Sequence, residues 1–376
     1  MATLISIVPY KFLPPVNGGH WGVIIVEKTL AVFNKVHTLS TDNNEKGKAY
    51  PFELYPVFTS GKSRYLPYSQ LAKAYAVASR LQPDYIFCHH HYMYPMAKRL
   101  AARLGVPLYI RCHNIEAERF RSTGKWWWKI MRFLERRAFQ KSDGVFFVTQ
   151  EDRDWAVKHY HLDKDKAVVM PFGIDFKSTP VLQADKTALA RQYNLRQDVP
   201  WLFFMGQLDY GPNEQAVQFI IRNIFPLLKE KLPSFHILLC GKRLSEALQQ
   251  EIRSVASDNN ICYLGFVPEI EPVIAACDVM INPVVAGGGV KTKVVESLAW
   301  NKTVVSAYSG AIGIEQAVCG EKLLVAPDGD WQAFTDLIGK ALAQPEAHIP
   351  KAYFDYYYAG HIAERLQPFF RAGKGN

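Results

Sequence analysis

Short apolar runs alternate with longer amphipathic stretches along the whole chain. Apolar runs of this length predict strands that are buried on both faces of a sheet. In the first half they are Leu4–Val8, Val36–Leu39, Asp84–Cys88, Pro107–Cys112, Gly144–Thr149 and Ala167–Met170. Helical periodicity lies between them, at Trp21–Phe33, Tyr68–Leu81, Met93–Leu104, Trp126–Gln140 and Arg153–Tyr160.

The second half repeats this alternation. Its strand-like runs are Trp201–Met205, His236–Cys240, Ile261–Leu264, Val279–Asn282, Thr303–Ser306 and Lys322–Val325. Its helical patterns are Asn213–Lys231, Ser245–Ala256, Val273–Ala276, Lys291–Trp300 and Trp331–Leu342. Strands that alternate with helices predict parallel sheets joined by right-handed crossovers. We therefore expect an α/β protein with two doubly wound, Rossmann-like domains.

Proline and glycine end the last strand of the first half within Met170–Asp175, and a polar stretch follows. This predicts an N-terminal domain at residues 1–172 and a C-terminal domain at 173–351. The aromatic-rich segment 352–376 predicts a helix that returns to the first domain. Ligands of doubly wound sheets bind beyond the carboxyl ends of the strands, so we expect the two domains to face each other across a binding cleft.

Composition narrows the class of protein. The 376 residues are 49% hydrophobic and 21% charged, which is typical of globular domains and excludes disordered and collagen-like chains. No uncharged apolar run reaches the roughly 18 residues of a transmembrane helix, and Ala2–Pro9 lacks the cationic start of a signal peptide. Six scattered cysteines without a Cys-x-x-Cys pair indicate reduced, buried thiols. We expect a cytoplasmic protein.

The net charge of +9 belongs to one half of the chain. Residues 1–180 hold 26 Lys and Arg against 15 Asp and Glu, whereas residues 181–376 hold 18 against 20. A one-sided basic surface indicates an anionic partner, which composition alone leaves open among a membrane, a nucleic acid and a phosphorylated substrate.

The segment with the most chemistry is the glycine turn after the strand Val279–Asn282. Gly287, Gly288 and Gly289 precede a helix that carries Lys293 and Glu296 on one face. Glycines let a phosphate approach the backbone, and the helix N-terminus attracts its charge. A lysine there suits a diphosphate, and the carboxylate suits two sugar hydroxyls. The same pattern also fits a plain turn followed by a solvated Lys–Glu pair.

The form Gly-Gly-Gly-x-Lys-x-Lys-x-x-Glu resembles the donor-binding loop and helix of GT-B-fold, retaining glycosyltransferases of family 4, the group 1 type. In that family a first Glu stands eight residues before the second. Here Glu296 matches the second Glu, and Gly288 stands where the first is expected. The resemblance implies that Glu296 holds the ribose, that Gly288 and Gly289 admit the phosphates, and that Lys293 with Lys291 supplies positive charge.

Four more segments resemble the family in the same order along the chain. They are Pro14–His20 with Gly18 and Gly19 beside the donor phosphates, the Gly206–Asn213 turn, Gly265–Glu269 with the backbone at Val267 against the base, and Ser309–Ile314. The resemblance implies that His113, after the strand Pro107–Cys112, orients the donor and stabilises charge in the transition state. From the residues alone, His113 also fits a strand-end histidine bonded to backbone.

Residues near the first-domain strand ends are expected on the acceptor side. Glu116 and Glu118 fit acceptor binding or pairing with Arg119 and Arg121. Adjacent His89, His90 and His91 cannot easily converge on one metal ion, so we expect neither a metal site nor a cofactor.

A basic, aromatic helix containing Trp126, Trp127 and Trp128 favours an anionic membrane surface over nucleic acid, since no nucleic-acid module accompanies the charge. From Tyr92 to Lys141 the chain has 12 Lys and Arg against 3 Glu. The alternative is an ordinary domain helix that buries part of the Trp run.

Three functions remain in view at this point. The resemblance implies a retaining, metal-independent glycosyltransferase that moves a sugar from a UDP- or GDP-linked donor to a glycan or lipid-linked acceptor. Its place would be cell-surface glycan or glycolipid synthesis, peripherally on the cytoplasmic membrane face. The alternatives are a sugar-nucleotide epimerase or phosphorylase-like enzyme of the same architecture, and a non-catalytic nucleotide-sugar-binding protein, for which the missing first Glu is the support.

Overall fold

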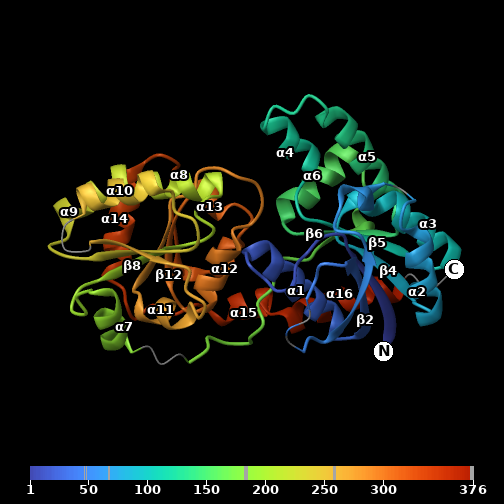
Figure 1. Ribbon diagram of the computed structural model, residues 1–376, viewed down its shortest axis with the longest axis horizontal. Helices are drawn as coiled ribbons and strands as arrows, with labels where there is room; N and C mark the ends of the chain where they lie inside the picture. The colour runs from blue at the N-terminus through green and yellow to red at the C-terminus, as the bar shows by residue number, and fades with distance from the viewer. Residues whose placement is uncertain (46, 48, 67, 182–184, 257–259, 373–376) are drawn as a thin grey trace. The chain divides into compact units, whose positions relative to one another are not determined.

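A computed structural model describes residues 1–45, 47, 49–66, 68–181, 185–256 and 260–372 (Figure 1). The chain divides into two compact units. Unit 1 comprises Met1–Asp175 and Tyr357–Asn376, and unit 2 comprises Phe176–Tyr356. The unit boundaries therefore fall at 175/176 and 356/357, against the 172/173 and 351/352 expected from the sequence. The last four residues of the predicted helix 352–376 lie outside the described residues.

Unit 1 holds a seven-stranded sheet in the order β3-β2-β1-β4-β5-β6-β7. Every neighbouring pair is parallel. The strands are β1 (Ala2–Val8), β2 (Asn34–Thr41), β3 (Phe52–Phe58), β4 (Tyr85–Cys88), β5 (Leu108–Cys112), β6 (Gly144–Phe147) and β7 (Ala167–Val169). The helices are α1 (Gly18–Ala31), α2 (Leu71–Leu81), α3 (Tyr94–Leu104), α4 (Glu116–Ser122), α5 (Trp128–Lys141), α6 (Gln150–Tyr160) and α16 (Ala359–Ala372).

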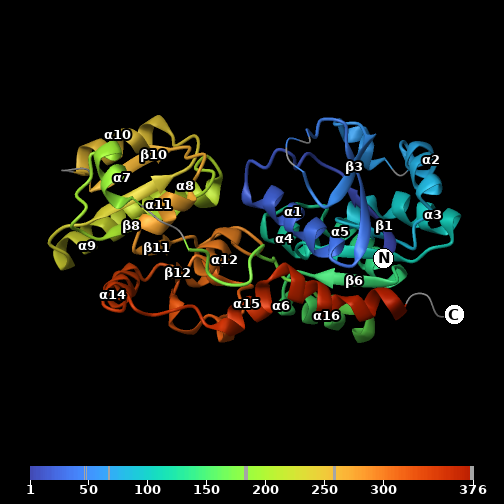
Figure 2. The same ribbon diagram turned by 90° about the horizontal axis from the view of Figure 1, so that it is seen from below.

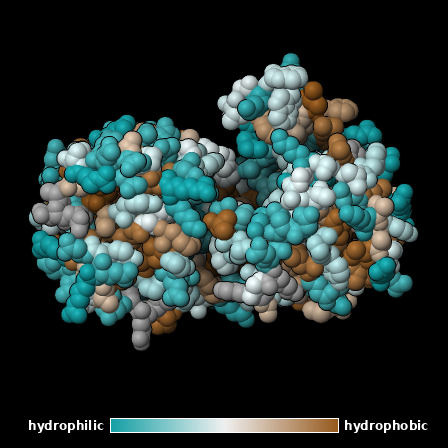
Figure 3. All heavy atoms as spheres, viewed as in Figure 1, coloured by the Kyte–Doolittle hydropathy of each residue, from teal (hydrophilic) through white to brown (hydrophobic). Residues whose placement is uncertain are grey.

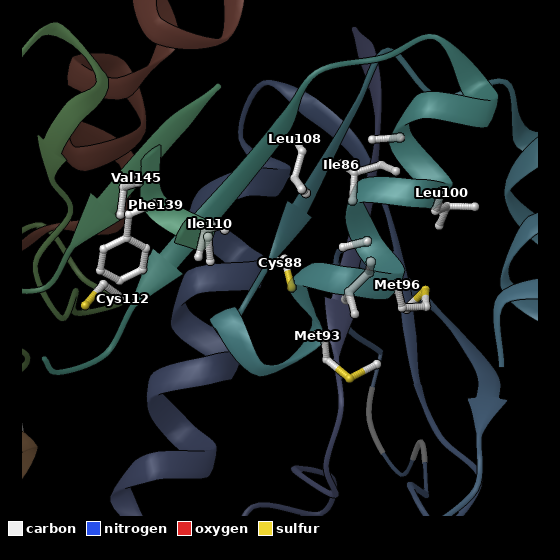
Figure 4. Close-up of a cluster of buried hydrophobic side chains, with 14 of the residues drawn as sticks. Ile86, Cys88, Met93, Met96, Leu100, Leu108, Ile110, Cys112, Phe139 and Val145 are labelled. Carbon is white, nitrogen blue, oxygen red and sulfur yellow. The ribbon is translucent and has the colours of Figure 1, made fainter. Parts of the chain in front are cut away.

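Helices cover both faces of this sheet, because its strands are apolar on both sides. On one face α3 presents Met96 and Leu100, one turn apart, and Figure 4 shows them beside Ile86 of β4 and Leu108 of β5. Pro95 in the first turn and the left-handed Gly105 at the end fix the length of this helix. On the other face α1 and α16 pack together on the sheet (Figure 2).

Strand β3 is the one strand that the apolar pattern fails to predict. It lies at the sheet edge, paired only with β2 among the described strands. Its sequence includes the exposed Glu53 and Pro56, which interrupt the apolar run. An edge strand tolerates both residues, since one side of its backbone makes no ladder hydrogen bonds.

Unit 2 holds a six-stranded sheet in the order β10-β9-β8-β11-β12-β13, again parallel throughout. The strands are β8 (Trp201–Met205), β9 (His236–Cys240), β10 (Ile261–Gly265), β11 (Val279–Asn282), β12 (Thr303–Ala307) and β13 (Leu323–Ala326). The helices are α7 (Lys186–Tyr193), α8 (Gly211–Phe219), α9 (Phe225–Lys231), α10 (Glu246–Val255), α11 (Glu271–Ala276), α12 (Thr292–Ala299), α13 (Tyr308–Ala311), α14 (Trp331–Leu342) and α15 (Lys351–Tyr357).

Three helices, α4, α7 and α13, were not expected, and the predicted helix Asn213–Lys231 is divided. A π-helical turn at Ile220–Ile224 separates α8 from α9, and Pro226 follows it in the first turn of α9. Proline lacks the N–H that a continuous α-helix needs at that position. In the described part of the chain, no helix combines the length and the apolar character that crossing a membrane requires.

Candidate active site

The first group of candidate residues lies at the carboxyl ends of the unit 2 strands, where β8 leads into α8. A Cβ atom at Gly206 would lie 2.7 Å from Asn213 Nδ2, and one at Gly241 would lie 1.8 Å from the Gly206 carbonyl oxygen. Asn213 Nδ2 donates to the Gln207 carbonyl oxygen at 2.9 Å. Only glycine fits at these distances, so glycine at both positions lets the loops after β8 and β9 touch.

The glycine turn after β11 is closed by a lysine. Gly287 and Gly289 have φ angles of 87° and 76°, a left-handed conformation that favours glycine. Lys291 Nζ donates to the carbonyl oxygens of both residues, at 2.9 Å each. Gly288 lies between them, and α12 begins directly after Lys291. The turn therefore brings exposed backbone and a cation to the N-terminus of α12, the end that attracts anions.

Lys293 lies one residue into α12 and reaches back to the loop after β8. Its Nζ donates to Asn213 Oδ1 at 3.0 Å and lies 3.9 Å from the centroid of the Phe204 ring. This contact joins the glycine turn to the Gly206 turn, and Asn213 and Lys293 are 80 positions apart in the sequence. The structure thus brings together the two strongest glycine motifs of the C-terminal half.

Neither lysine has a carboxylate partner among the residues that the structure describes. Burial lowers the pKa of Lys291 to about 8. Burial, and then the charge of Lys291, hold the pKa of Lys293 well below its usual value. Because both lysines are half-buried without a counter-ion, their charged forms are disfavoured. An anion bound between them would offset this free-energy penalty.

Glu296 lies one turn further along α12 and is half-buried. Its carboxylate has no hydrogen bond or ion pair to the described residues. Burial, and then the charge of Glu271, raise the pKa of Glu296 to about 7. Such a carboxylate gains from hydroxyl donors that bind its charged form. Val267, expected near the base, lies in the loop after β10, next to the exposed Phe266.

Sequence reasoning missed a basic pair at this same edge. Lys242 and Arg243 follow β9, and the Lys242 carbonyl oxygen accepts from the Leu208 N–H at 3.0 Å. Lys242 Nζ lies 3.8 Å from the centroid of the Phe266 ring, and Arg243 pairs with Asp209 at 3.1 Å. The sequence shows no basic residue in the Gly206 turn itself. The pair could have been found from its position directly after β9, because β9 pairs in parallel with β8 and the two strands end at the same edge of the sheet.

In unit 1 the loop after β1 runs into α1. Asn17 caps this helix, with its Oδ1 accepting from the His20 N–H at 3.0 Å. Gly18 and Gly19 therefore form the first turn of α1, which begins three residues earlier than the predicted Trp21. The prediction that Gly18 and Gly19 lie in a loop is wrong, because the Asn17 cap extends the helix to include both glycines.

His113 follows β5 and stacks on His90, which follows β4. The ring centroids are 4.3 Å apart and the planes differ by 18°. Burial, and then the charges of His90 and Arg111, hold the pKa of His113 well below its usual value. His113 is thus a neutral imidazole at the carboxyl edge of the unit 1 sheet.

The three consecutive histidines after β4 point to three different partners. His89 Nε2 lies 2.7 Å from the buried Glu27 Oε1 of α1, and His91 Nε2 lies 3.1 Å from Met131 Sδ of α5. His90 takes part in the ring stack. Throughout the described ranges, no group of three or more His, Cys, Asp or Glu side chains is arranged to hold a metal ion.

Glu116 opens α4 and is only 3% exposed. It forms an ion pair with Arg119 and accepts from the Tyr92 hydroxyl, while Glu118 pairs with Arg121 at 2.7 Å. The buried Glu135 of α5 accepts from the Glu116 N–H at 2.9 Å, and burial raises the pKa of Glu135 to about 7. Glu116 is therefore held in place by its neighbours, as its pairing alternative predicted.

Trp126 and Trp127 precede α5, and Trp128 is the first residue of that helix. Trp127 packs on Phe120 with ring centroids 4.3 Å apart, whereas Trp126 is 83% exposed. Ile130, Phe133 and Leu134 of α5 are 55%, 63% and 48% exposed. Hydrophobic side chains show on the α4–α5 pair in Figure 3. We call Trp126, Ile130, Phe133 and Leu134 the α5 patch; the exposed Lys125, Lys129, Arg136 and Arg137 lie among them in sequence.

Two sequence families match the chain, one in each half. "Glycosyltransferase Family 4" matches residues 34–178, and "Glycosyl transferases group 1" matches residues 199–344. A protein in the cps region of Klebsiella pneumoniae is 24% identical over 65% of this chain. The match spans 62% of that relative, less than two thirds of its length.

Solved structures show the same fold over the whole chain. HepE of Anabaena, in complex with UDP and glucose, has a TM-score of 0.73 at 16% identity, with 99% of this chain and 100% of that chain covered. WaaG, a glycosyltransferase involved in lipopolysaccharide biosynthesis, has a TM-score of 0.65 at 15% identity, with 100% of both chains covered. With two parallel-sheet units, each matched by a glycosyltransferase family, the chain belongs to the group 1 glycosyltransferases of the GT-B fold.

Proposed function

We propose that this chain is a retaining glycosyltransferase that moves a sugar from a UDP- or GDP-linked donor to a hydroxyl of a glycan or lipid-linked acceptor. The observation that carries the proposal is the pair Lys291 and Lys293, half-buried at the N-terminus of α12 without a carboxylate partner among the described residues. HepE binds UDP and glucose and shares the fold, which supports a nucleotide sugar as the ligand.

Each unit 2 group has a role in holding the donor. The glycines Gly206, Gly288 and Gly289 leave room for the diphosphate against the backbone, and the two lysines neutralise it. Glu296 accepts hydrogen bonds from the ribose hydroxyls. The backbone at Val267 contacts the base. Because the lysines provide charge at the diphosphate, the proposed reaction assigns that task to side chains rather than to a bound metal ion.

In the reaction, the bond between the sugar C1 and the diphosphate oxygen breaks, and its electron pair leaves with the phosphate. The acceptor oxygen bonds to C1 on the same face, and the acceptor proton passes to a phosphate oxygen of the leaving group. Gly18 and Gly19 at the start of α1 give the phosphates room and backbone N–H groups. His113, neutral and fixed by its stack, orients the sugar while positive charge develops at C1.

We further propose that the α5 patch binds an anionic membrane surface, with the adjoining lysines and arginines on the lipid headgroups. Apolar side chains flanked by basic residues suit the interface between headgroups and acyl chains. WaaG acts in lipopolysaccharide biosynthesis, which supports a glycolipid or cell-surface glycan as the acceptor. The protein would then work peripherally, on the cytoplasmic face of a membrane.

The test is a calorimetric titration of the chain with UDP-glucose and GDP-mannose, comparing the wild type with Glu296→Ala. Loss of the ribose contacts should weaken binding about 10- to 100-fold, since hydrogen bonds to a charged group contribute roughly 1.5–3 kcal/mol. The exposed Glu321→Gln, in the same unit, is the matched control and should bind like the wild type. If no nucleotide sugar binds, the proposal fails.

Because Gly288 stands where the family has a carboxylate, the experiments must also distinguish two other functions. Tight binding without turnover on a broad acceptor panel would favour a non-catalytic nucleotide-sugar-binding protein. Isomerised sugar nucleotide in the absence of any acceptor would favour an epimerase. Transfer with the anomeric configuration kept, read from the proton NMR spectrum of the product, is the result expected for the retaining transferase.

A further inference from the structure

Helices α2 and α3 lie side by side on the unit 1 sheet and present tyrosines that are covered by arginines (Figures 1 and 2). Arg99 Cζ lies 3.8 Å from the centroid of the Tyr68 ring. Arg103 Cζ lies 5.7 Å from the centroid of the Tyr75 ring. Because Arg99 and Arg103 are one turn apart on the same side of α3, the two pairs are neighbours on the surface.

A third pair lies beside the carboxyl edge of the same sheet. Arg64 Cζ lies 4.6 Å from the centroid of the Tyr65 ring, and that ring meets Tyr92 edge-on with centroids 6.3 Å apart. Helix α3 follows β4 and runs back toward the amino edge, so the other two pairs lie progressively further from the carboxyl edge. The three pairs form what we call the tyrosine–arginine row: Arg64, Tyr65, Tyr68, Tyr75, Arg99 and Arg103.

The row is positively charged, and the sequence around it supplies almost no negative charge. Residues 54–83 and 85–115 contain eight Lys and Arg and no Asp or Glu. Arg99 and Arg103 are exposed and make no ion pair or hydrogen bond to a residue that the structure describes. A guanidinium that lies flat on a ring keeps the N–H groups at its edge free, and two of them can bind one carboxylate. The row therefore complements a partner with repeated negative charges.

The exposed rings favour a glycan over a membrane as that partner. Tyr65, Tyr68 and Tyr75 are 38%, 51% and 37% exposed. An exposed aromatic ring matches the flat C–H face of a sugar, while the tyrosine hydroxyl remains in water. Among the described residues of α2, α3 and the turn before them, Leu66 is the one large aliphatic side chain that is exposed. A surface that enters the acyl region of a membrane needs several such side chains, as the α5 patch has.

We propose that the tyrosine–arginine row is a docking surface for an acidic glycan, a chain of sugars that carry carboxylates. The arginines bind the carboxylates, and the tyrosines pack against the sugar rings. Residues one turn apart on a helix have Cβ atoms about 5–6 Å apart, which is comparable with the length of one sugar unit. That this glycan is the acceptor rests on the proposed function, and its chain then extends from the carboxyl edge of unit 1 over α2 and α3.

The experiment measures binding of hexagalacturonate and hexamannuronate to the full chain by calorimetry, with no nucleotide present. Their methyl esters are the matched probes, because they keep the sugar chain and lose its charge. The test variant is Arg99→Gln with Arg103→Gln. The control variant is Arg136→Gln with Arg137→Gln, which removes the same charge from exposed positions of α5. Melting temperatures check that both variants fold.

The wild type should bind at least one acidic hexamer about tenfold more tightly than its methyl ester. Arg99→Gln with Arg103→Gln should remove this preference, since the bonds between the guanidinium groups and the carboxylates are lost. The control should change the affinity less than about twofold, because salt screens exposed charges at a distance. Tyr68→Leu with Tyr75→Leu should weaken binding of the acid and of the ester alike, about tenfold, because the sugar rings lose their aromatic surface.

Four results would overturn the inference. The first is that neither acidic hexamer binds, and the second is that both arginine variants lose equal affinity. The third is that Arg99→Gln with Arg103→Gln keeps hexamer binding and loses binding to phosphatidylserine vesicles, which assigns the row to a membrane. The fourth is tighter binding of single-stranded DNA than of either hexamer.

The same titrations separate this inference from the proposed function. A chain that binds an acidic hexamer through Arg99 and Arg103 but binds no nucleotide sugar supports the docking surface and counts against the proposed function. A chain that binds a nucleotide sugar and neither hexamer keeps the proposed function and loses the docking surface.

Discussion

Apart from the additional strand β7 of unit 1, the carboxyl edges of the two sheets are built on the same strand order, yet they differ in charge. Unit 2 presents Lys291 and Lys293, whose charges no described carboxylate neutralises. Unit 1 presents the stacked His90 and His113, whose pKa values are lowered so that both rings are neutral. Yet residues 1–180 carry the excess of Lys and Arg, and residues 181–376 have slightly more Asp and Glu. The net charge of a region therefore does not indicate the charge of its site.

Net charge and site charge differ because some charged side chains are exposed to water and others are half-buried. The positive charge of the first half includes the exposed Lys125, Lys129, Arg136 and Arg137 around α5, which water and salt screen. Lys293 of the second half is half-buried between Asn213 and the Phe204 ring, where its field is screened far less. Net charge thus concerns long-range attraction to a surface, whereas burial decides which ion a site binds.

The largest expected effect comes from removing the unit 2 charge with Lys293→Met. Affinity for UDP and GDP should fall about 100-fold, as expected for a charge-assisted bond worth roughly 3 kcal/mol. The free energy of unfolding should change little, because the loss of the bond to Asn213 is offset by the removal of a half-buried charge without a counter-ion. Isothermal calorimetry and urea denaturation measure the two quantities.

The control for this variant is Lys302→Met in the same unit. Lys302 Nζ donates to the carbonyl oxygens of Ala275 and Cys277, at 2.9 Å and 2.7 Å. Its loss should lower the free energy of unfolding by about 1–3 kcal/mol and leave nucleotide affinity unchanged. Equal nucleotide affinity in Lys293→Met and the wild type would show that the diphosphate binds elsewhere.

The next effect concerns pH and Lys291, whose pKa is about 8 instead of its usual 10.5. In the free protein, the lysine is only partly charged at pH 8. A bound diphosphate favours the charged form and raises the pKa, so binding at pH 8 should take up protons and should weaken as pH rises further. Calorimetry at pH 8 in buffers of different ionisation enthalpy measures the uptake.

Lys291 affects folding stability in the opposite direction: binding weakens as pH rises, whereas its contribution to the free energy of unfolding increases. Between pH 8 and 10.5 the unfolded chain binds more protons at this lysine than the folded chain does. The free energy of unfolding therefore gains from this group as pH rises through that window. Lys291→Met should remove this gain and reduce the proton uptake on binding. Unchanged proton uptake in Lys291→Met would rule out Lys291 as a phosphate ligand.

The smallest effect concerns the exposed α5 patch of unit 1 and the basic residues beside it. The double change Trp126→Ala and Phe133→Ala should weaken binding to phosphatidylserine vesicles about tenfold, because it removes exposed apolar area from the α5 patch. Binding of the wild type should also fall as salt is raised. Tyr308→Ala, an exposed aromatic residue of unit 2, is the control. Equal binding to neutral and anionic vesicles would contradict a role for the basic residues.

Much of this fold is visible in the sequence because strands buried on both faces read as apolar runs. Strands β8, β9 and β11 begin and end at the predicted residues. Strand β3 was missed because its edge position admits Glu53 and Pro56, which break the run. The start of α1 was misplaced because the Asn17 cap is a local hydrogen bond and not a periodic pattern.

Local motifs also indicated the unit 2 site, since the glycine turn, Lys293 and Glu296 lie within ten residues of one another. Contacts between distant segments could not be predicted in the same way. The Lys293–Asn213 bond, the approach of Lys242 to Phe266 and the stacking of His90 on His113 all depend on which strands are neighbours. The spacing of residues in the sequence does not show which strands are neighbours in the sheet.

The most direct test of the central claim compares each nucleoside diphosphate with its own nucleoside. The claim is that the carboxyl edge of unit 2 is a diphosphate site held by unneutralised lysines. Titration of the wild type with UDP and uridine, and with GDP and guanosine, measures the contribution of the diphosphate alone. For the preferred base, we predict at least about 100-fold tighter binding of the diphosphate, equivalent to roughly 2.7 kcal/mol. Equal affinity for diphosphate and nucleoside, or no binding of either pair, would contradict the account.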